Sequence, residues 1–113
     1  MSLTIQHRRK DGTEILDLAG QLTLGDGTGA LRAAIQKASD NAVDLLVNLS
    51  GVSYLDSAGL GELVGSYARV TSKGKRMKLL NPQKRVDALL QITKLYSTFE
   101  CFTDEREALE SFS

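Results

Sequence analysis

The stretch Val52-Ser53-Tyr54-Leu55-Asp56-Ser57-Ala58-Gly59-Leu60-Gly61 marks the passage from a buried strand to a helix. An apolar run at 44–49 precedes it, and apolar residues at helical spacing follow it: Leu60, Leu63, Val64, Tyr67 and Val70. A helix start offers backbone N–H groups without intrahelical acceptors and a partial positive charge, which suit a phosphate group. We therefore expect Ser57 to be a surface hydroxyl at a rigid junction, beside small residues that let another molecule approach.

Strand and helix patterns alternate on both sides of this junction. Strands are predicted at 3–9, 14–19, 44–49, 76–80 and 99–102, and Asp11-Gly12 indicates a hairpin between the first two. Helices are predicted from Asp26 or Thr28 to Ser39, at 57–72, after Asn81-Pro82, and from Asp104 to about Ser111. The order ββαβαβαβα predicts one α/β domain over residues 1–113: a mixed, mostly parallel sheet of four to five strands with about four helices against it.

Local signals predict how several of these elements begin. Asn81 is expected to cap the third helix, with Pro82 in its first turn, and Asp104 and Glu107 have the spacing of a capping box. Asp56 is expected to cap the second helix through the N–H of Gly59, or to orient the Ser57 hydroxyl. The glycine-rich run 25–29 lacks the lysine of a phosphate-binding loop, so we interpret it as a flexible connection.

Composition argues against several classes of function. Lys plus Arg and Asp plus Glu both number 14, so no basic excess favours nucleic acid, and the basic segment 73–78 is predicted to be a solvated turn. The sequence shows no secretory signal and no apolar run of roughly 18 residues, so we expect a cytoplasmic protein without a membrane segment. The single cysteine, Cys101, cannot form an internal disulfide and is predicted to be a buried structural thiol.

The sequence shows none of the residue combinations that are typical of an active site. The single histidine, His7, lies in the first strand, and nothing places it beside Ser57 as a base. The loop at Ser57 lacks the first glycine of a G-x-S-x-G elbow, and the chain has no His/Cys cluster or G-x-x-x-x-G-K-[ST] loop. We expect no enzyme activity, no metal and no cofactor.

One face of the predicted second helix carries small residues: Ala58, Gly61, Gly65 and Ala68. Two interpretations remain open. The face packs closely against a neighbouring element, or it forms a flat seat for a partner beside Ser57. Ser57 itself is either a plain N-terminal cap of the helix or a phosphorylation site.

The segment Asp56-Ser57-Ala58-Gly59-Leu60-Gly61, after a Leu-Val-Asn-Leu strand, resembles the signature loop of anti-sigma factor antagonists, the small bacterial STAS-domain proteins. Gly20-Gln21-Leu22 and Leu79-Leu80-Asn81-Pro82 extend the resemblance, which covers Leu3 to about Phe112. In that family the anti-sigma factor is a serine kinase that phosphorylates the first serine of the loop. The resemblance assigns this role to Ser57.

Two positions depart from the family pattern. Ala58 stands where a second Ser or Thr usually follows, which removes an alternative phosphate acceptor. The usual acidic residue after Gly-Glu-Leu is also missing, because Gln21-Leu22-Thr23-Leu24 stands there.

The resemblance implies a binding module controlled by phosphorylation. The unphosphorylated form would bind the anti-sigma factor kinase and release a sigma factor, phosphorylation on Ser57 would end binding, and a PP2C-type serine phosphatase would restore it. The expected partner-binding residues are Thr23, Leu24, Tyr54, Asp56, Ser57, Ala58, Gly59 and Leu60, although Leu60 also falls on the predicted buried helix face. The alternative is a non-switching STAS subunit of a lipid-transport ATPase or a stress-signalling scaffold. We expect a monomer or weak dimer.

Overall fold

The computed structural model describes residues 3–113, apart from the side chain of Tyr96. Its strands form one mixed β-sheet, and helices pack against this sheet. The five strands of this part lie side by side in the order β1-β2-β3-β4-β5; β1 is antiparallel to β2 and the other pairs are parallel. This confirms the predicted fold class and element order. The elements are β1 (Leu3–Lys10), β2 (Thr13–Leu22), α1 (Asp26–Asp40), β3 (Asp44–Leu55), α2 (Ser57–Ser72), β4 (Met77–Leu80), α3 (Lys84–Ile92), the 3₁₀ turn η1 (Leu95–Ser97), β5 (Cys101–Phe102) and α4 (Glu105–Glu110).

The hairpin between β1 and β2 forms as its sequence predicts. Asp11 and Gly12 have φ angles of 54° and 80°, the left-handed values of a two-residue turn whose twist matches that of the flanking strands. Lys10 then pairs with Thr13, and the register continues to Leu3 opposite Gly20.

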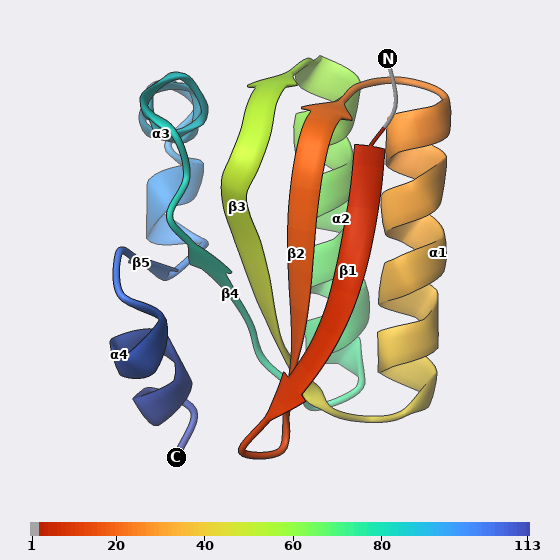
Figure 1. The fold of residues 1–113 in the computed structure, drawn as a ribbon. Coiled ribbons are helices and arrows are strands. Elements are labelled where there is room, and N and C mark those ends of the chain that lie inside the picture. The colour runs from red at the N-terminus through yellow and green to blue at the C-terminus, as the bar shows by residue number, and fades with distance from the viewer. Residues whose placement is uncertain (1–2) are drawn as a thin grey trace.

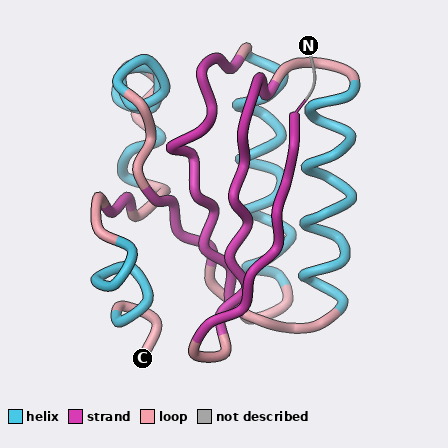
Figure 2. The backbone as a smooth tube through the Cα atoms, in the orientation of Figure 1, coloured by secondary structure: helices cyan, strands magenta, loops and turns pink. Residues whose placement is uncertain are grey.

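Alternating side chains divide the sheet between two cores. Leu16 and Val47 face the main core with α1 and α2, whereas Ile15 and Leu46 face a smaller core built with α4. Figures 1 and 2 show α1 and α2 starting at the end of the molecule where β2 and β3 finish. The carboxyl ends of β2 and β3 and the starts of both helices therefore meet at one edge of the fold.

Strand β3 is longer than predicted, because it continues from Leu49 to Leu55. The prediction failed since the register against β2 shifts twice, between Asp17 and Ala19 and between Gly20 and Gln21, so the two-residue alternation is broken. The second half of β3 curves away from the short strand β4, and α3 packs beside it there (Figure 1). The two register shifts are β-bulges, and the strand that contains them ends next to Asp56.

Other local predictions are corrected around β4 and β5. Asn81 does not cap the third helix: it has a φ of 51°, its N–H donates to the carbonyl of Phe102 (2.7 Å), and α3 starts only at Lys84 after Gln83. Strand β5 is limited to Cys101–Phe102, and Cys101 is half-buried where a fully buried thiol was expected; burial raises the pKa of this thiol to about 11.

Lys78 is likewise buried, although the basic segment 73–78 was predicted to be a solvated turn. Its Nζ donates to the carbonyl (3.1 Å) and the hydroxyl (2.9 Å) of Ser111 and lies 4.6 Å from the centre of the Phe112 ring. These partners come from the end of the chain, so the local charge pattern could not reveal them. The predicted cap of α4 is confirmed, because Asp104 accepts from the N–H of Glu107 (3.0 Å).

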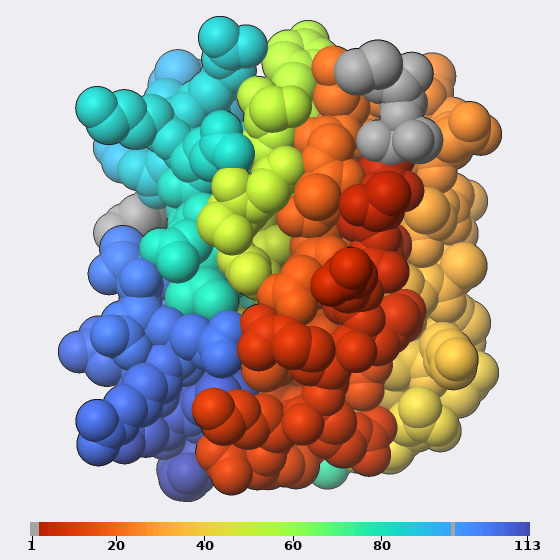
Figure 3. Space-filling view, in the orientation of Figure 1, coloured from red at the N-terminus to blue at the C-terminus, as the bar shows by residue number. Residues whose placement is uncertain are grey.

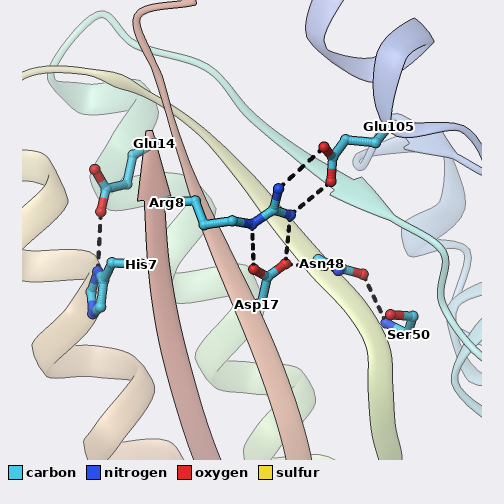
Figure 4. A network of polar contacts seen from close by, with 7 residues as sticks. All are labelled: His7, Arg8, Glu14, Asp17, Asn48, Ser50 and Glu105. Carbon is cyan, nitrogen blue, oxygen red and sulfur yellow. Dashed lines mark hydrogen bonds and ion pairs between the residues drawn. The ribbon is translucent and has the colours of Figure 1, made fainter. Parts of the chain in front are cut away.

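Arg8 ties α4 to the exposed face of the sheet (Figure 4). Its guanidinium forms two hydrogen bonds with Asp17 (2.6 and 2.9 Å) and two with Glu105 (3.2 and 2.7 Å), while Asn48 also donates to Asp17 (2.8 Å). These bonds to Arg8 hold the pKa values of Asp17 and Glu105 below their ordinary values. In the space-filling view the side chains of β1, β2 and β3 form the central surface beside the C-terminal segments (Figure 3).

Replacement of Arg8 should change both the stability and its dependence on acid. Carboxylates with lowered pKa values stabilise the fold above the unfolded pKa of roughly 4, and this contribution is lost as pH falls through the folded values. Because Arg8 is partly exposed and screened, Arg8→Met should lower the free energy of unfolding at pH 7 by about 1 kcal/mol.

The same variant should lose less stability than the wild type between pH 5 and pH 2, measured by urea unfolding. The matched control is Arg106→Met, because Arg106 is highly exposed and, among residues 3–113, its one ion pair is with Glu110 of its own helix. An unchanged acid response in Arg8→Met would contradict the assignment of this network.

Candidate functional site

The start of α2 is fixed by Asp56, which adopts the extended backbone of an N-cap. Its Oδ1 accepts a hydrogen bond from the N–H of Gly59 (2.8 Å), as the sequence predicts. Hydrogen bonds from the Gly59 and Leu24 amides lower the pKa of the Asp56 carboxyl. Asp56 is therefore ionised at neutral pH, and Ser57 becomes the first residue of the helix.

The second oxygen of Asp56 reaches the loop that follows β2. Oδ2 accepts from the N–H of Leu24 (3.1 Å), a residue 32 positions earlier in the chain. The next amide, that of Gly25, donates to the Thr28 hydroxyl (3.2 Å), and the N–H of Thr28 donates to the Thr23 carbonyl (3.1 Å). The sequence reasoning missed this connection, since nothing local links two segments so far apart.

The glycine-rich run 25–29 forms the first turns of α1 and corrects the expectation of a flexible connection. Gly25 has a φ of 105°, which a residue with a side chain adopts only with strain. A Cβ at Gly27 would lie 2.8 Å from the carbonyl oxygen of Gln21. Gly25 and Gly27 are thus needed for a tight entry into α1.

Gly59 lets α2 approach the end of β2 very closely. A Cβ at this position would lie 2.1 Å from the carbonyl oxygen of Leu22, and Gly59 is buried. By contrast, Cβ atoms at Gly61 and Gly65 would meet no atom within 4 Å. The interpretation of close packing is therefore wrong at Gly61 and Gly65, and it applies instead to Gly59.

Ser57 is exposed, and the hydrogen bond from Leu24 to Asp56 joins the start of its helix to the loop that carries Thr23 and Leu24. Leu24 is 78% exposed and Tyr54 is 43% exposed, while Thr23 and Ala58 are partly exposed. We call these five residues, Thr23, Leu24, Tyr54, Ser57 and Ala58, the Ser57 surface. Asp56 is half-buried and fixes the backbone of this surface through its two hydrogen bonds, whereas Gly59 and Leu60 are buried and do not belong to it.

This surface suits modification better than catalysis. The N–H groups of Ser57 and Ala58 belong to the first helical turn, which has no intrahelical acceptors, so they can face an anion. The His7 ring nitrogen forms a hydrogen bond with Glu14 (3.0 Å), and His7 pairs with Leu16 of β2. Leu16 lies six residues before the end of β2, which separates it from that end by about 20 Å along the strand. His7 therefore cannot serve as a base for Ser57.

Metal-binding clusters and membrane-spanning helices are both absent from the part of the chain that the structure describes. Residues 3–113 contain no group of three or more His, Cys, Asp and Glu side chains that could hold a metal ion. Within the same part, none of the helices has the length and apolar character needed to cross a membrane.

A family model described as "Mlab, STAS domain" matches residues 5–97. The anti-sigma-B factor antagonist of Bacillus subtilis is 30% identical over 95 residues, covering 84% of this chain and 86% of that relative. The chain belongs to the STAS-domain family of anti-sigma factor antagonists. The anti-sigma-B factor antagonist of Staphylococcus aureus strain NCTC 8325 is also 30% identical over 95 residues, covering 84% of this chain and 88% of the relative.

Solved STAS structures share the fold. An anti-sigma factor antagonist from Mycobacterium paratuberculosis superposes with a TM-score of 0.84 at 23% identity, covering 98% of this chain and 94% of that one. The Bacillus cell fate determinant SpoIIAA in its phosphorylated form gives a TM-score of 0.76 at 23% identity, with 97% and 100% covered. These likenesses support the fold of this STAS domain.

Two alanine substitutions on α2 should have opposite effects on stability. Gly59→Ala should lower the free energy of unfolding by about 2 kcal/mol or more, because its methyl group would clash with the backbone carbonyl of Leu22, which cannot move without disturbing β2. Gly61→Ala should raise it by about 0.5–1 kcal/mol, because alanine suits a helix better and the space is open. Chemical denaturation of both variants would measure the difference, and equal effects would contradict the close approach at Gly59.

Proposed function

We propose that this chain, as one STAS domain over residues 1–113, is an anti-sigma factor antagonist switched by phosphorylation of Ser57. Its unphosphorylated form binds an anti-sigma factor that is a serine kinase, and the bound sigma factor is released. The kinase uses ATP to phosphorylate Ser57, and the modified form no longer binds. The protein acts by binding and not by catalysis.

The observation that carries the proposal is the exposed Ser57 hydroxyl on a fixed helix start. A kinase needs access to the oxygen, and Ser57 is exposed, as are Leu24 and Tyr54. The Asp56 hydrogen bonds to Gly59 and Leu24 hold the backbone on both sides of this surface. The names of the curated relatives support the same function.

Added charge is sufficient to end binding. A phosphate brings about −1.5 to −2 charges at pH 7, beside the ionised Asp56. The first-turn amides of α2 accommodate part of this charge, so the fold tolerates it. A partner surface that covers a neutral hydroxyl would instead meet an unpaired anion, at a cost of roughly 3–4 kcal/mol, or a few hundred-fold in affinity.

The cycle needs a second partner to reverse it. A PP2C-type serine phosphatase would remove the phosphate, and the exposed position of Ser57 gives such an enzyme access. Because the proposed kinase uses ATP, the proposal places this cycle in the cytoplasm. Between its complexes the protein would be a monomer or weak dimer.

The second candidate is a STAS subunit that does not switch, in a lipid-transport ATPase or a stress-signalling scaffold. The description of the matching family model, "Mlab, STAS domain", differs from the names of the curated relatives and favours this candidate. Such a subunit would use the Ser57 surface for permanent assembly. Its complex would form without phosphate transfer and would persist after incubation with ATP.

Phosphate transfer from Mg-ATP by the anti-sigma kinase of the same genome should be lost in Ser57→Ala. Ser57→Asp should bind that kinase at least tenfold more weakly, because its carboxylate brings a negative charge into the interface. Its melting temperature should stay within about 2 °C of the wild type, since the side chain is exposed. Intact-mass spectrometry, titration of the complex and thermal unfolding measure these outcomes.

Ser53→Ala is the matched control, because Ser53 is another exposed serine just before the site, at a bulge of β3. It should gain phosphate at the wild-type rate. Equal phosphate transfer to Ser57→Ala and wild type would contradict the site. Stable binding to a partner that never transfers phosphate would favour the second candidate.

A further inference from the structure

Leu24 is held in an unusual position for a large apolar side chain. It is 78% exposed, yet the backbone on each side of it is fixed by hydrogen bonds. Its own N–H donates to Asp56, the Gly25 N–H donates to the Thr28 hydroxyl, and the Thr23 carbonyl accepts from Thr28. A single exposed leucine is common on protein surfaces, but one on a backbone fixed at three consecutive residues is already ordered for contact.

The carboxylate of Asp56 connects this leucine to Ser57. One oxygen caps α2 through Gly59, which fixes the helix that begins with Ser57, and the other accepts the amide of Leu24. The two distances, 2.8 and 3.1 Å, show that both hydrogen bonds form at once. Any partner that docks on Ser57 therefore meets Leu24 at a defined place relative to the hydroxyl.

We infer that Asp56 is a positioning residue that sets Leu24 as an apolar anchor for the kinase, which binds it in an apolar pocket beside the phosphate-transfer site. This inference rests on the proposed function. Tyr54 belongs to the same contact, because it is 43% exposed and lies on the strand residue two before Asp56. Asp26, the first residue of α1, is also exposed, so the apolar contact is confined to Leu24 and Tyr54. Because the exposed side chain at position 24 is a leucine, the pocket that receives it is apolar.

Asparagine at position 56 separates the two roles of Asp56. An asparagine side chain has one carbonyl oxygen and one NH₂ group, so it can accept from Gly59 but cannot also accept from Leu24 with its second atom. Asparagine caps helices as well as aspartate does, so α2 should keep its start. Asp56→Asn thus releases Leu24 while it leaves Ser57 in place.

Kinetics with the purified anti-sigma kinase and Mg-ATP test the anchor. Leu24→Ala should raise KM roughly tenfold, because an apolar side chain no longer leaves water on binding, and should leave kcat within about twofold. Asp56→Asn should raise KM by roughly threefold to tenfold, again without a large loss of kcat. In the Leu24→Ala background, Asp56→Asn should have little further effect, because both changes act through the same side chain.

Ile92→Ala is the matched control, because Ile92 is also 78% exposed but lies at the end of α3. It should leave KM unchanged. Equal effects of Leu24→Ala and Ile92→Ala would overturn the anchor. Effects of Asp56→Asn and Leu24→Ala that multiply in the double variant, or a loss confined to kcat, would overturn the positioning role.

Amide hydrogen exchange of the isolated protein tests the connection without a partner. The Leu24 amide should exchange at least tenfold faster in Asp56→Asn than in the wild type, while the Gly59 amide keeps its protection. Unchanged exchange at Leu24 would overturn the inference even if phosphorylation occurs. If wild-type protein gains no phosphate from the kinase, the proposed function fails, whatever the exchange experiment shows about Asp56.

Discussion

The close approach of α2 to the end of β2 is the constraint on which the Ser57 surface depends. Gly59 lies where any Cβ would come within 2.1 Å of the Leu22 carbonyl oxygen, so only glycine lets the helix start this near the sheet. At this separation the single carboxylate of Asp56 reaches both its own helix and the Leu24 amide. The bulges in β3 contribute, because they shift the register that delivers Asp56 to this edge. A rigid backbone therefore presents a small hydroxyl, and under the proposed function a change of charge on that hydroxyl alters binding without a change of fold.

The residues of the signature loop divide sharply between support and contact. Asp56 and Gly59 set the backbone, and Leu60 joins the main core, while Ser57 is exposed and Ala58 is partly exposed. The stabilising polar network around Arg8 lies on the sheet face that meets α4 and joins different residues altogether (Figure 4). This separation matters for a switch, because substitutions or modifications at the contact residues disturb few of the interactions that hold the fold. Under the proposed function, binding is adjusted at Ser57 while the stability of the domain is maintained elsewhere.

Local patterns in the sequence were enough for the element order, the hairpin at Asp11 and the caps at Asp56 and Asp104. They failed where a partner lies far along the chain. The hydrogen bonds from Lys78 to Ser111 and from Leu24 to Asp56 join segments more than 30 residues apart, so no local charge or spacing indicates them. The length of β3 was missed because bulges interrupt its alternation, and the role of Gly59 depends on a neighbouring carbonyl that only the folded chain supplies. The exposure of Ser57 was predictable, whereas the order imposed on Leu24 was not.

The departures from the family pattern bear on the choice of partner. The usual pattern implied by the resemblance has an acidic residue in the loop after β2, where this chain has Thr23 and Leu24. A kinase that pairs a basic side chain with that acid would bury an uncompensated cation against Leu24, and such a loss of a charge partner costs several kcal/mol. A kinase with an apolar pocket would gain from the same leucine and would be penalised by an acidic residue in a related antagonist. Under the proposed function, one position in the loop therefore discriminates between kinases in both directions, while Ser57 and its supporting cap remain the same chemical target.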